Sequence, residues 1–282
     1  MKNAIIIIVV LCSFLFVESC RRSVVLTPDL QVVSAAKIPV ETNDSAWRNA
    51  PTHGSKLILQ DLVEPRLMET STQDVQVQAI TDGKEVAFRL EWHDDTKNDA
   101  AKPHNFVDGC AVQIPVKIEE SVPAPQMGET NKIVQISYWR ADWQAIVDGR
   151  ADDITAMYPN SKPDHYPFNA KSLEKNTQAQ KEMAERYAPA RALGNNRQGP
   201  RKQPVEDLLA EGPGTISPNP KPFSKGKGGR TDKGWEVIIT RPLPEGFSKN
   251  KPTQIAFAVW EGSHGETGAR KMRTGWVNLI MK

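Results

Sequence analysis

The chain has 282 residues, of which 39% are hydrophobic and 25% charged, so it can bury the core of one large domain or two small ones. Lys and Arg nearly balance Asp and Glu, and the net charge of +2 excludes the strong basic excess of a nucleic-acid-binding surface. The 3 cysteines exclude a disulfide-rich scaffold.

The first 20 residues differ from the rest of the chain. Lys2 precedes an unbroken apolar run over 4–17, which is shorter than the roughly 20 residues that span a bilayer. The run is typical of a secretory signal, so 1–20 predicts export to the periplasm. The segment ends in "VESC", which resembles a lipoprotein cleavage box and would make Cys20 a lipidation site. An ordinary cleaved signal and an uncleaved anchor are the alternatives.

After a leader over 21–37, most of the chain alternates between apolar and polar residues as β-strands do. The clearest case is 74–95, where two alternating runs flank Asp82-Gly83, a hairpin turn signal. The predicted strands lie at 55–63, 74–95, 109–118, 132–143, 234–243, 253–263 and 274–281. Strands of this length separated by Gly, Pro and Asn or Asp predict a mainly β fold, an antiparallel β-sandwich over 38–282.

The sandwich is predicted to carry a helical and loop-rich insertion at about 150–232. Strong helix formers fill 170–193, with Ser172 as a cap and Pro189 as the end or a kink. The segments around it are turn-rich and basic, and "GKGG" at 226–229 lacks the strand-to-helix context of a phosphate-binding loop. A long insertion in a compact domain is more often functional or interface-forming than idle.

Motifs for catalysis and metal binding are weak. The five histidines form no H-x-x-x-H pair, and no G-x-S-x-G or P-loop is present, which disfavours a stand-alone hydrolase. The absence of C-x-x-C-H excludes covalent haem attachment, and no cysteine pair is available for zinc or an iron–sulfur cluster. The acidic "WHDD" at 92–95 fits either a calcium site or the turn at a strand end.

Four stretches, in order, carry a family resemblance: "VAFRLEWHDDT", "PQMGETNKIVQISYWRADWQ", "ARALGNNRQGPRKQPVEDLLAEGPGTI" and the segment from "WEVIITRPL" to "ARKMRTGW". Together they resemble the haem b-binding gamma subunit of the type II dimethyl sulfoxide reductase family. That family includes ethylbenzene dehydrogenase, dimethylsulfide dehydrogenase, selenate reductase, chlorate reductase and, more loosely, nitrite oxidoreductase.

The resemblance implies a β-sandwich that holds one haem b without covalent bonds. It places the axial ligands at Met127, in the Met-Gly turn before a Trp-containing strand, and at Lys271, before the last strand. Met272 and His264 are alternatives for the second ligand. A non-catalytic electron-transfer subunit is implied, with an iron–sulfur beta subunit, a molybdopterin alpha subunit and a cytochrome or other carrier as partners.

The chemistry of the proposed pair is consistent with this role. A methionine thioether tends to raise the potential of haem iron. Lysine, whose pKa is normally about 10.4, binds iron only as the neutral amine, so coordination and burial must displace its proton. Two filled axial positions leave none for a substrate.

Trp139, Trp143 and Trp260 would line the haem pocket or else pack in the core of the sandwich. Arg140 or Arg191 would form charge-assisted hydrogen bonds with the haem propionates.

A second hypothesis belongs to another class of protein. The same sandwich resembles family 9 carbohydrate-binding modules, in which paired tryptophans stack on sugars. The tryptophan pair and "WHDD" would then form a sugar site, and Met127 would have no role.

Overall fold

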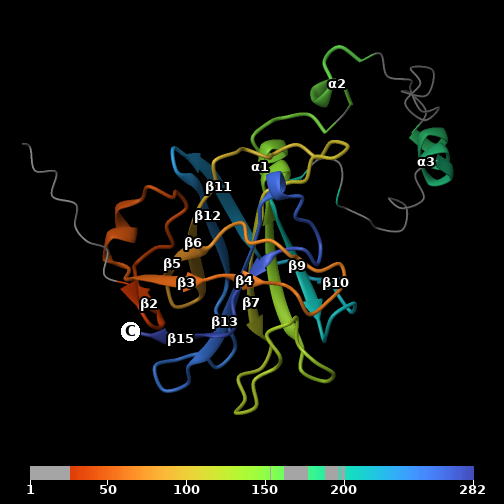
Figure 1. Cartoon of the computed structure of the whole chain (residues 1–282). Helices are drawn as coiled ribbons and strands as arrows, with labels where there is room; N and C mark the ends of the chain where they lie inside the picture. The colour runs from red at the N-terminus through yellow and green to blue at the C-terminus, as the bar shows by residue number, and fades with distance from the viewer. Residues whose placement is uncertain (1–25, 153, 162–176, 188–196, 198–200) are drawn as a thin grey trace, which may run out of the picture.

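The computed structural model describes residues 26–152, 154–161, 177–187, 197 and 201–282. The signal segment, Cys20, Ser172, Pro189 and Arg191 therefore lie outside the described residues. The chain folds into two layers of β-strands that curl into one continuous sheet (Figure 1). The mainly β sandwich predicted from the sequence is confirmed. Within the described ranges no helix is both long and apolar enough to cross a membrane.

The two layers meet at one strand, which pairs with both of them. The first layer contains β1 (Leu26–Thr27), β2 (Leu30–Ser34), β3 (Thr52–Lys56), β5 (Asp74–Thr81), β6 (Glu85–His93), β11 (Lys225–Thr231), β12 (Gly234–Pro242) and β15 (Val277–Met281). The second contains β4 (Ile58–Leu59), β7 (Gly109–Pro115), β8 (Val134–Arg140), β9 (Val205–Ala210), β10 (Ser217–Pro218), β13 (Thr253–Trp260) and β14 (Met272–Arg273). The start of β13 pairs with β15, and its end pairs with β7 and β14.

Most strand pairs are antiparallel, as predicted, and the parallel ones involve the N-terminal strands. β2 pairs in parallel with both β15 and β5, and β1 pairs in parallel with β3. β2 lies within the stretch that the sequence assigned to a leader, yet it is an interior strand of the first layer with Leu30 and Val32 fully buried. Its five residues are too few for alternation to reveal it.

The main core lies between the layers, where alternate residues of both sheets face inward. Its largest fully buried side chains include Trp139 of β8, Phe88 of β6 and Phe257 of β13. The Asp82-Gly83 hairpin between β5 and β6 forms as predicted, with Gly83 at φ 89° and the Asp82 carboxylate accepting bonds from the backbone N–H groups of Lys84 and Glu85.

The C-terminal part of the range predicted as an insertion, 150–232, contributes strands to the sheets. The described helices of this range are α2 (Ile154–Met157) and α3 (Thr177–Tyr187), which lie between β8 and β9. Residues 205–231 supply β9, β10 and β11 to the sheets. At the other boundary, the strand predicted over 132–143 ends at Arg140, and Trp143 lies in α1 (Ala141–Val147).

The glycine-rich "GKGG" segment forms part of β11 because its glycines allow close packing. A Cβ atom added at Gly228 would lie 2.3 Å from Cζ2 of Trp139, and one added at Gly226 would lie 2.3 Å from Cγ2 of Val205. Glycine in a strand commonly marks such a close approach. The segment reads as a loop by composition, but it is an edge strand that packs over a core tryptophan.

Candidate functional site

The outward face of the second layer carries an apolar cluster, although an outer sheet face is usually polar. We call these residues the outer-face cluster: buried Ala111, Val134, Ile136, Leu208, Ala210 and Trp260, with partly buried Met127, Tyr138, Ala258 and Trp276 packed against them. Strands β7, β8, β9 and β13 contribute alternate residues to it, and the intervening residues of β7 and β13 enter the main core. The cluster is a second apolar region, separate from the space between the layers.

Met127 reaches this cluster from a turn in the long loop between β7 and β8, one of the lime loops at the foot of Figure 1. Its φ of 68° is unusual for a residue with a side chain, and Gly128 follows at φ 82°. The Met127 carbonyl accepts a 2.8 Å bond from the N–H of Gly212, which fixes the turn against the loop after β9. A Cβ added at Gly128 would lie 2.7 Å from the carbonyl oxygen of Lys132. The Met-Gly pair is therefore set by the local backbone.

Lys271 reaches the same face from the other side, immediately before β14. The register pairs Val259 with Met272, so Lys271 stands opposite Trp260. Its Nζ lies 5.2 Å from the centroid of the Trp260 ring. Burial, and to a lesser extent the charge of Arg273, lower the pKa of Lys271 to about 8. The fold thus favours the neutral amine more than water does.

The structure brings Met127 and Lys271 to one face, with Trp260 as the shared element. Met127 packs against the cluster to which Trp260 belongs, and the Lys271 amine lies over the Trp260 ring. The two other candidate residues lie elsewhere. Met272 is 1% exposed and packs in the main core, on the opposite side of β14. His264, in the short helix η4 (Gly262–His264), is half-exposed, and its Nε2 lies 3.4 Å from Oε1 of Glu261.

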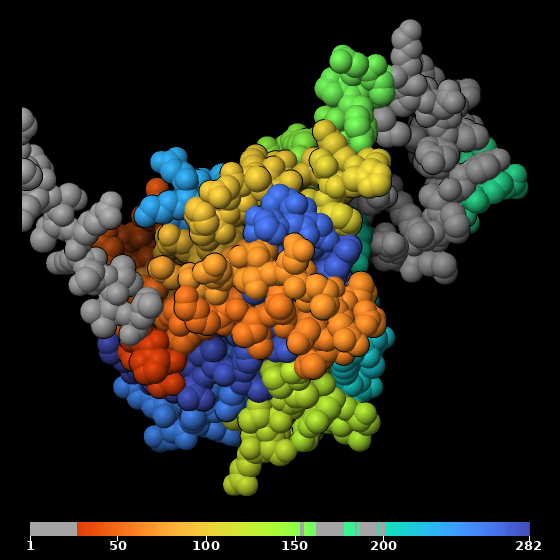
Figure 2. Space-filling model, in the orientation of Figure 1, coloured from red at the N-terminus to blue at the C-terminus, as the bar shows by residue number. Residues whose placement is uncertain are grey.

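The loop after β4 covers the strand that carries Lys271. The backbone N–H of Gln60 donates to the carbonyl of Lys271 at 3.1 Å, and the Gln60 side-chain amide donates to the carbonyl of Ala269 at 3.0 Å. In Figure 2 the orange atoms of this part of the chain form a band across the blue C-terminal segments. Leu62 and Met68 in this loop are exposed. The backbone around Lys271 is therefore held on both edges, by β13 and by this loop.

Of the three tryptophans that the sequence singled out, only Trp260 belongs to the outer-face cluster. Trp139 is fully buried between the layers, 5.2 Å from Trp235 by ring centroid. Trp143 is 1% exposed, and the guanidinium of Arg201 lies 3.9 Å from its centroid. Neither Trp139 nor Trp143 offers an open ring face to a sugar. Arg140 is held by both carboxylate oxygens of Asp142 at 2.7 and 2.9 Å.

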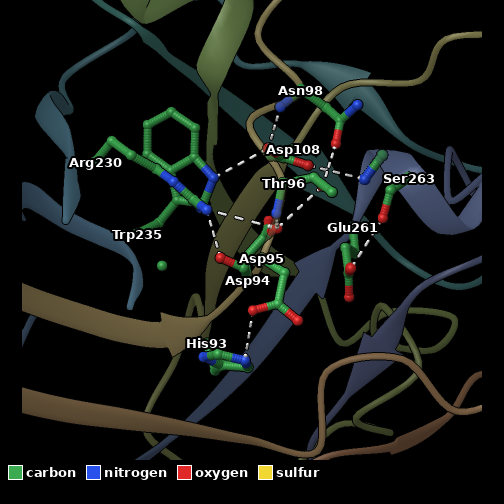
Figure 3. A network of polar contacts seen from close by, with 12 residues as sticks. His93, Asp94, Asp95, Thr96, Asn98, Asp108, Arg230, Trp235, Glu261 and Ser263 are labelled. Carbon is green, nitrogen blue, oxygen red and sulfur yellow. Dashed lines mark hydrogen bonds and ion pairs between the residues drawn. The ribbon is translucent and has the colours of Figure 1, made fainter. Parts of the chain in front are cut away.

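A polar network that the sequence did not reveal closes one end of the sandwich (Figure 3). Asp108 is fully buried and accepts bonds from the N–H of Gly262, the N–H of Asn98 and Nε1 of Trp235, at 2.9, 2.7 and 3.0 Å. Burial, the larger cause, and the charge of Asp94 raise the pKa of Asp108 to about 6. No motif marks Asp108, because its partners come from three separate parts of the chain.

The "WHDD" segment belongs to this network. Asp94 is buried, and its Oδ1 accepts a 2.8 Å bond from the N–H of Thr96, while Arg230 donates to its carbonyl. The exposed His93 and Asp95 side chains pair with each other at 3.2 Å. Across the described part of the chain, no three His, Cys, Asp or Glu residues are grouped to hold a metal ion. The segment therefore forms the turn at the end of β6, and the calcium interpretation gains no support.

Comparison with known proteins places this architecture in a family. Residues 44–272 match the sequence model of a family described as ethylbenzene dehydrogenase. A putative respiratory nitrate reductase heme subunit of Haloferax mediterranei is 24% identical over 257 residues, covering 89% of this chain and 71% of that protein. The chlorate reductase subunit gamma of Ideonella dechloratans is 25% identical over 244 residues, covering 83% of this chain and 77% of that protein.

Among solved structures, a family 9 carbohydrate-binding module from Caldicellulosiruptor kristjanssonii aligns over 90% of this chain and 93% of its own, with a TM-score of 0.38 and 9% identity. The family match is of a different kind, because it spans most of the chain and includes both Met127 and Lys271. The chain belongs to the ethylbenzene dehydrogenase family.

Proposed function

We propose that this chain is a non-catalytic electron-transfer subunit that binds one haem b without covalent bonds, with Met127 and Lys271 as the axial ligands of the iron. The observation that carries the proposal is that two residues far apart in sequence reach one apolar face. The relatives support it, since one is named a heme subunit and the other a gamma subunit of a reductase.

The residues of this face fit a flat apolar ring. Small side chains, Ala111 and Ala258, stand beside the large rings of Tyr138, Trp260 and Trp276 in the outer-face cluster. The Trp276 indole N–H donates to the carbonyl of Pro123, which holds the loop before Met127 against this face. Cofactor sites are lined mainly by hydrophobic and aromatic side chains, which is the composition of the outer-face cluster. Bound haem supplies one-electron chemistry at its iron.

Each proposed ligand has a role that its surroundings support. Lys271 must give up a proton to bind, and its burial lowers the cost of the neutral form. Met127 is presented by a turn whose backbone angles Gly128 makes possible, and its soft sulfur favours the reduced iron. With both residues bound to the iron, no coordination position would remain for a substrate, so the haem would supply electron relay rather than catalysis.

We propose further that the chain passes electrons between an iron–sulfur beta subunit and a cytochrome or other carrier, while a molybdopterin alpha subunit carries out the substrate chemistry. The names of the two relatives as subunits of reductases support a role within a complex. The apolar run over 4–17 supports export to the periplasm, with Cys20 as the residue that would carry a lipid. Co-purification of the tagged chain and mass spectrometry of its mature N-terminus test these two points.

The central test is reconstitution of the purified full chain with haem. We expect a low-spin, six-coordinate b-type visible spectrum that is lost or becomes high-spin in Met127→Ala and in Lys271→Ala. Met68→Ala and Lys249→Ala are matched controls, because both side chains are exposed and neither belongs to the outer-face cluster. Folded protein that takes up no haem, or variants that keep the six-coordinate spectrum, would overturn the proposal. Binding of cello-oligosaccharide by haem-free protein would favour the carbohydrate-binding alternative.

A further inference from the structure

Arg273 is a buried cation beside the proposed iron ligand. It pairs across the strands with Ala258, which packs against the outer-face cluster, so its side chain leaves β14 on the same face as Lys271. Two residues along a strand, side chains on one face are separated by about 7 Å. Arg273 is only 8% exposed. A charged group therefore lies on the apolar face that the haem is proposed to occupy.

Arg273 has too few partners for a buried charge. Its Nη1 donates a hydrogen bond to the carbonyl of Thr274 at 3.4 Å, which is long for such a bond. Its Nε is buried without a partner. Among the described residues it forms no salt bridge, although Asp61 is close enough for its charge to act on the guanidinium. Buried guanidinium groups are normally paired, since an unpaired one is costly.

Among the described arginines, Arg241 and Arg270 also have buried side-chain nitrogens without partners. Arg241 belongs to β12 of the first layer and donates to Gln135, and Arg270 lies over the ring of Phe106. Arg140, which the sequence offered as a propionate partner, is held by Asp142 through two bonds, and Arg191 lies outside the described residues. Arg230 and Arg150 are likewise paired, with Asp94 and Asp99 respectively. Of these described arginines, Arg273 is the one that β14 places on the outer face with Lys271, and it forms no salt bridge with another described residue.

We propose that Arg273 binds a propionate carboxylate of the haem and so anchors and orients the ring whose iron Met127 and Lys271 hold. This inference rests on the proposed function. A haem carries its carboxylates on its rim, away from the iron, and Arg273 stands two residues along the chain from the proposed iron ligand, on the same face. Guanidinium and carboxylate form charge-assisted, often bidentate hydrogen bonds, which satisfy both the unpaired Nε and the buried charge.

The test compares haem with its dimethyl ester, in which both carboxylates are capped, on the full chain. We expect wild type to bind haem about ten- to a hundredfold more tightly than the ester, because a hydrogen-bonded charge is lost. In Arg273→Gln that preference should collapse, while the six-coordinate spectrum of the bound haem remains. Arg270→Gln, which removes the same charge from a neighbouring residue stacked on Phe106, should retain the wild-type preference.

The possible results distinguish the role of Arg273 from the proposed binding of haem. If wild type takes up neither haem nor ester, the proposed function fails, and this inference with it. If wild type binds haem and Arg273→Gln keeps the full preference over the ester, the function stands and the role of Arg273 is wrong. Should Arg273→Gln not fold, Arg273→Lys decides. The lysine ammonium keeps the positive charge but lacks the planar guanidinium that can bind a carboxylate through two hydrogen bonds. An intermediate preference for haem over the ester supports the proposal, whereas an unchanged preference contradicts it.

Discussion

The Lys271 amine lies 5.2 Å from the centroid of the Trp260 ring, because Lys271, immediately before β14, stands opposite Trp260 at the end of β13. The strand pairing fixes this relationship, because both β4 and β13 hold β14 in register. The fold therefore fixes the position of the Lys271 amine over the Trp260 ring, where burial disfavours its positive charge.

Trp260→Ala should weaken both the fold and the haem site. The ring is 7% exposed, and its N–H donates to the carbonyl of Gly268 at 3.1 Å, so its loss leaves a cavity and an unpaired carbonyl. Substitutions of this kind cost about 3–5 kcal/mol of the free energy of unfolding. Denaturant titration of haem-free protein measures this cost. Trp260→Phe should recover most of the stability, and a Trp260→Ala protein as stable as wild type would contradict the account.

Gly128→Ala should disturb the haem site through the turn that presents Met127. Alanine disfavours the φ of 82°, and its Cβ would lie 2.7 Å from the carbonyl of Lys132. We expect a loss of about 1 kcal/mol or more in stability together with weaker haem binding. Gly83→Ala is the matched control, because Gly83 has a φ of 89° but open space around it, in a distant hairpin. Equal effects of the two variants on haem affinity would count against a special role for the Met-Gly turn.

Gly228→Ala should destabilise the sandwich through the core tryptophan. Its Cβ would lie 2.3 Å from Trp139, a ring that is fully buried and has nowhere to move, whereas the adjacent Gly229 has no atom within 4 Å of its added Cβ. Overpacking of this kind typically costs about 1–3 kcal/mol. Thermal unfolding of the two variants gives the comparison. Gly229→Ala should be close to wild type, and similar midpoints for both would show that β11 does not pack as described.

Stability should fall as the pH rises from about 4 to about 6, in part because of Asp108. Its folded pKa is raised to about 6, above the ordinary value of 3.8, so the folded state holds a proton that the unfolded chain has released across this interval. Stability therefore decreases with rising pH until Asp108 ionises in the folded state, and the group adds no slope above that. Asp108→Asn should flatten this part of the profile, whatever its own cost in stability. An unchanged slope in urea titrations between pH 4 and 6 would refute the assignment.

Much of the fold could be predicted from the sequence, because alternation is strong where one face of a strand is buried. The hairpin over 74–95 is the clearest example, and β12 and β13 follow the same pattern. β2 and β14 could not be found in this way, since five and two residues carry too little periodicity. β11 could not be predicted for another reason. Its glycines are typical of a loop, but in the structure they make room for the side chains of Trp139 and Val205, which pack against the strand.

The site was predictable only in part. The residues of "RKMR" at 270–273 read as one crowded loop, whereas β14 turns Met272 into the core and leaves Lys271 and Arg273 on the outer face. Deciding between neighbours in this way needs the strand register, which sequence alone does not supply. Asp108 had no signal at all, because its importance comes from burial and from partners distant in the chain.

Near-infrared magnetic circular dichroism of the oxidised, haem-loaded protein tests the central claim most directly, because its charge-transfer band depends on the pair of axial ligands. We predict the signature of thioether and amine ligation in wild type, replaced by a different one in Met127→Ala and again in Lys271→Ala, with Met68→Ala and Lys249→Ala unchanged. A signature of histidine ligation in wild type, or one that survives the loss of Met127 or Lys271, would contradict the account.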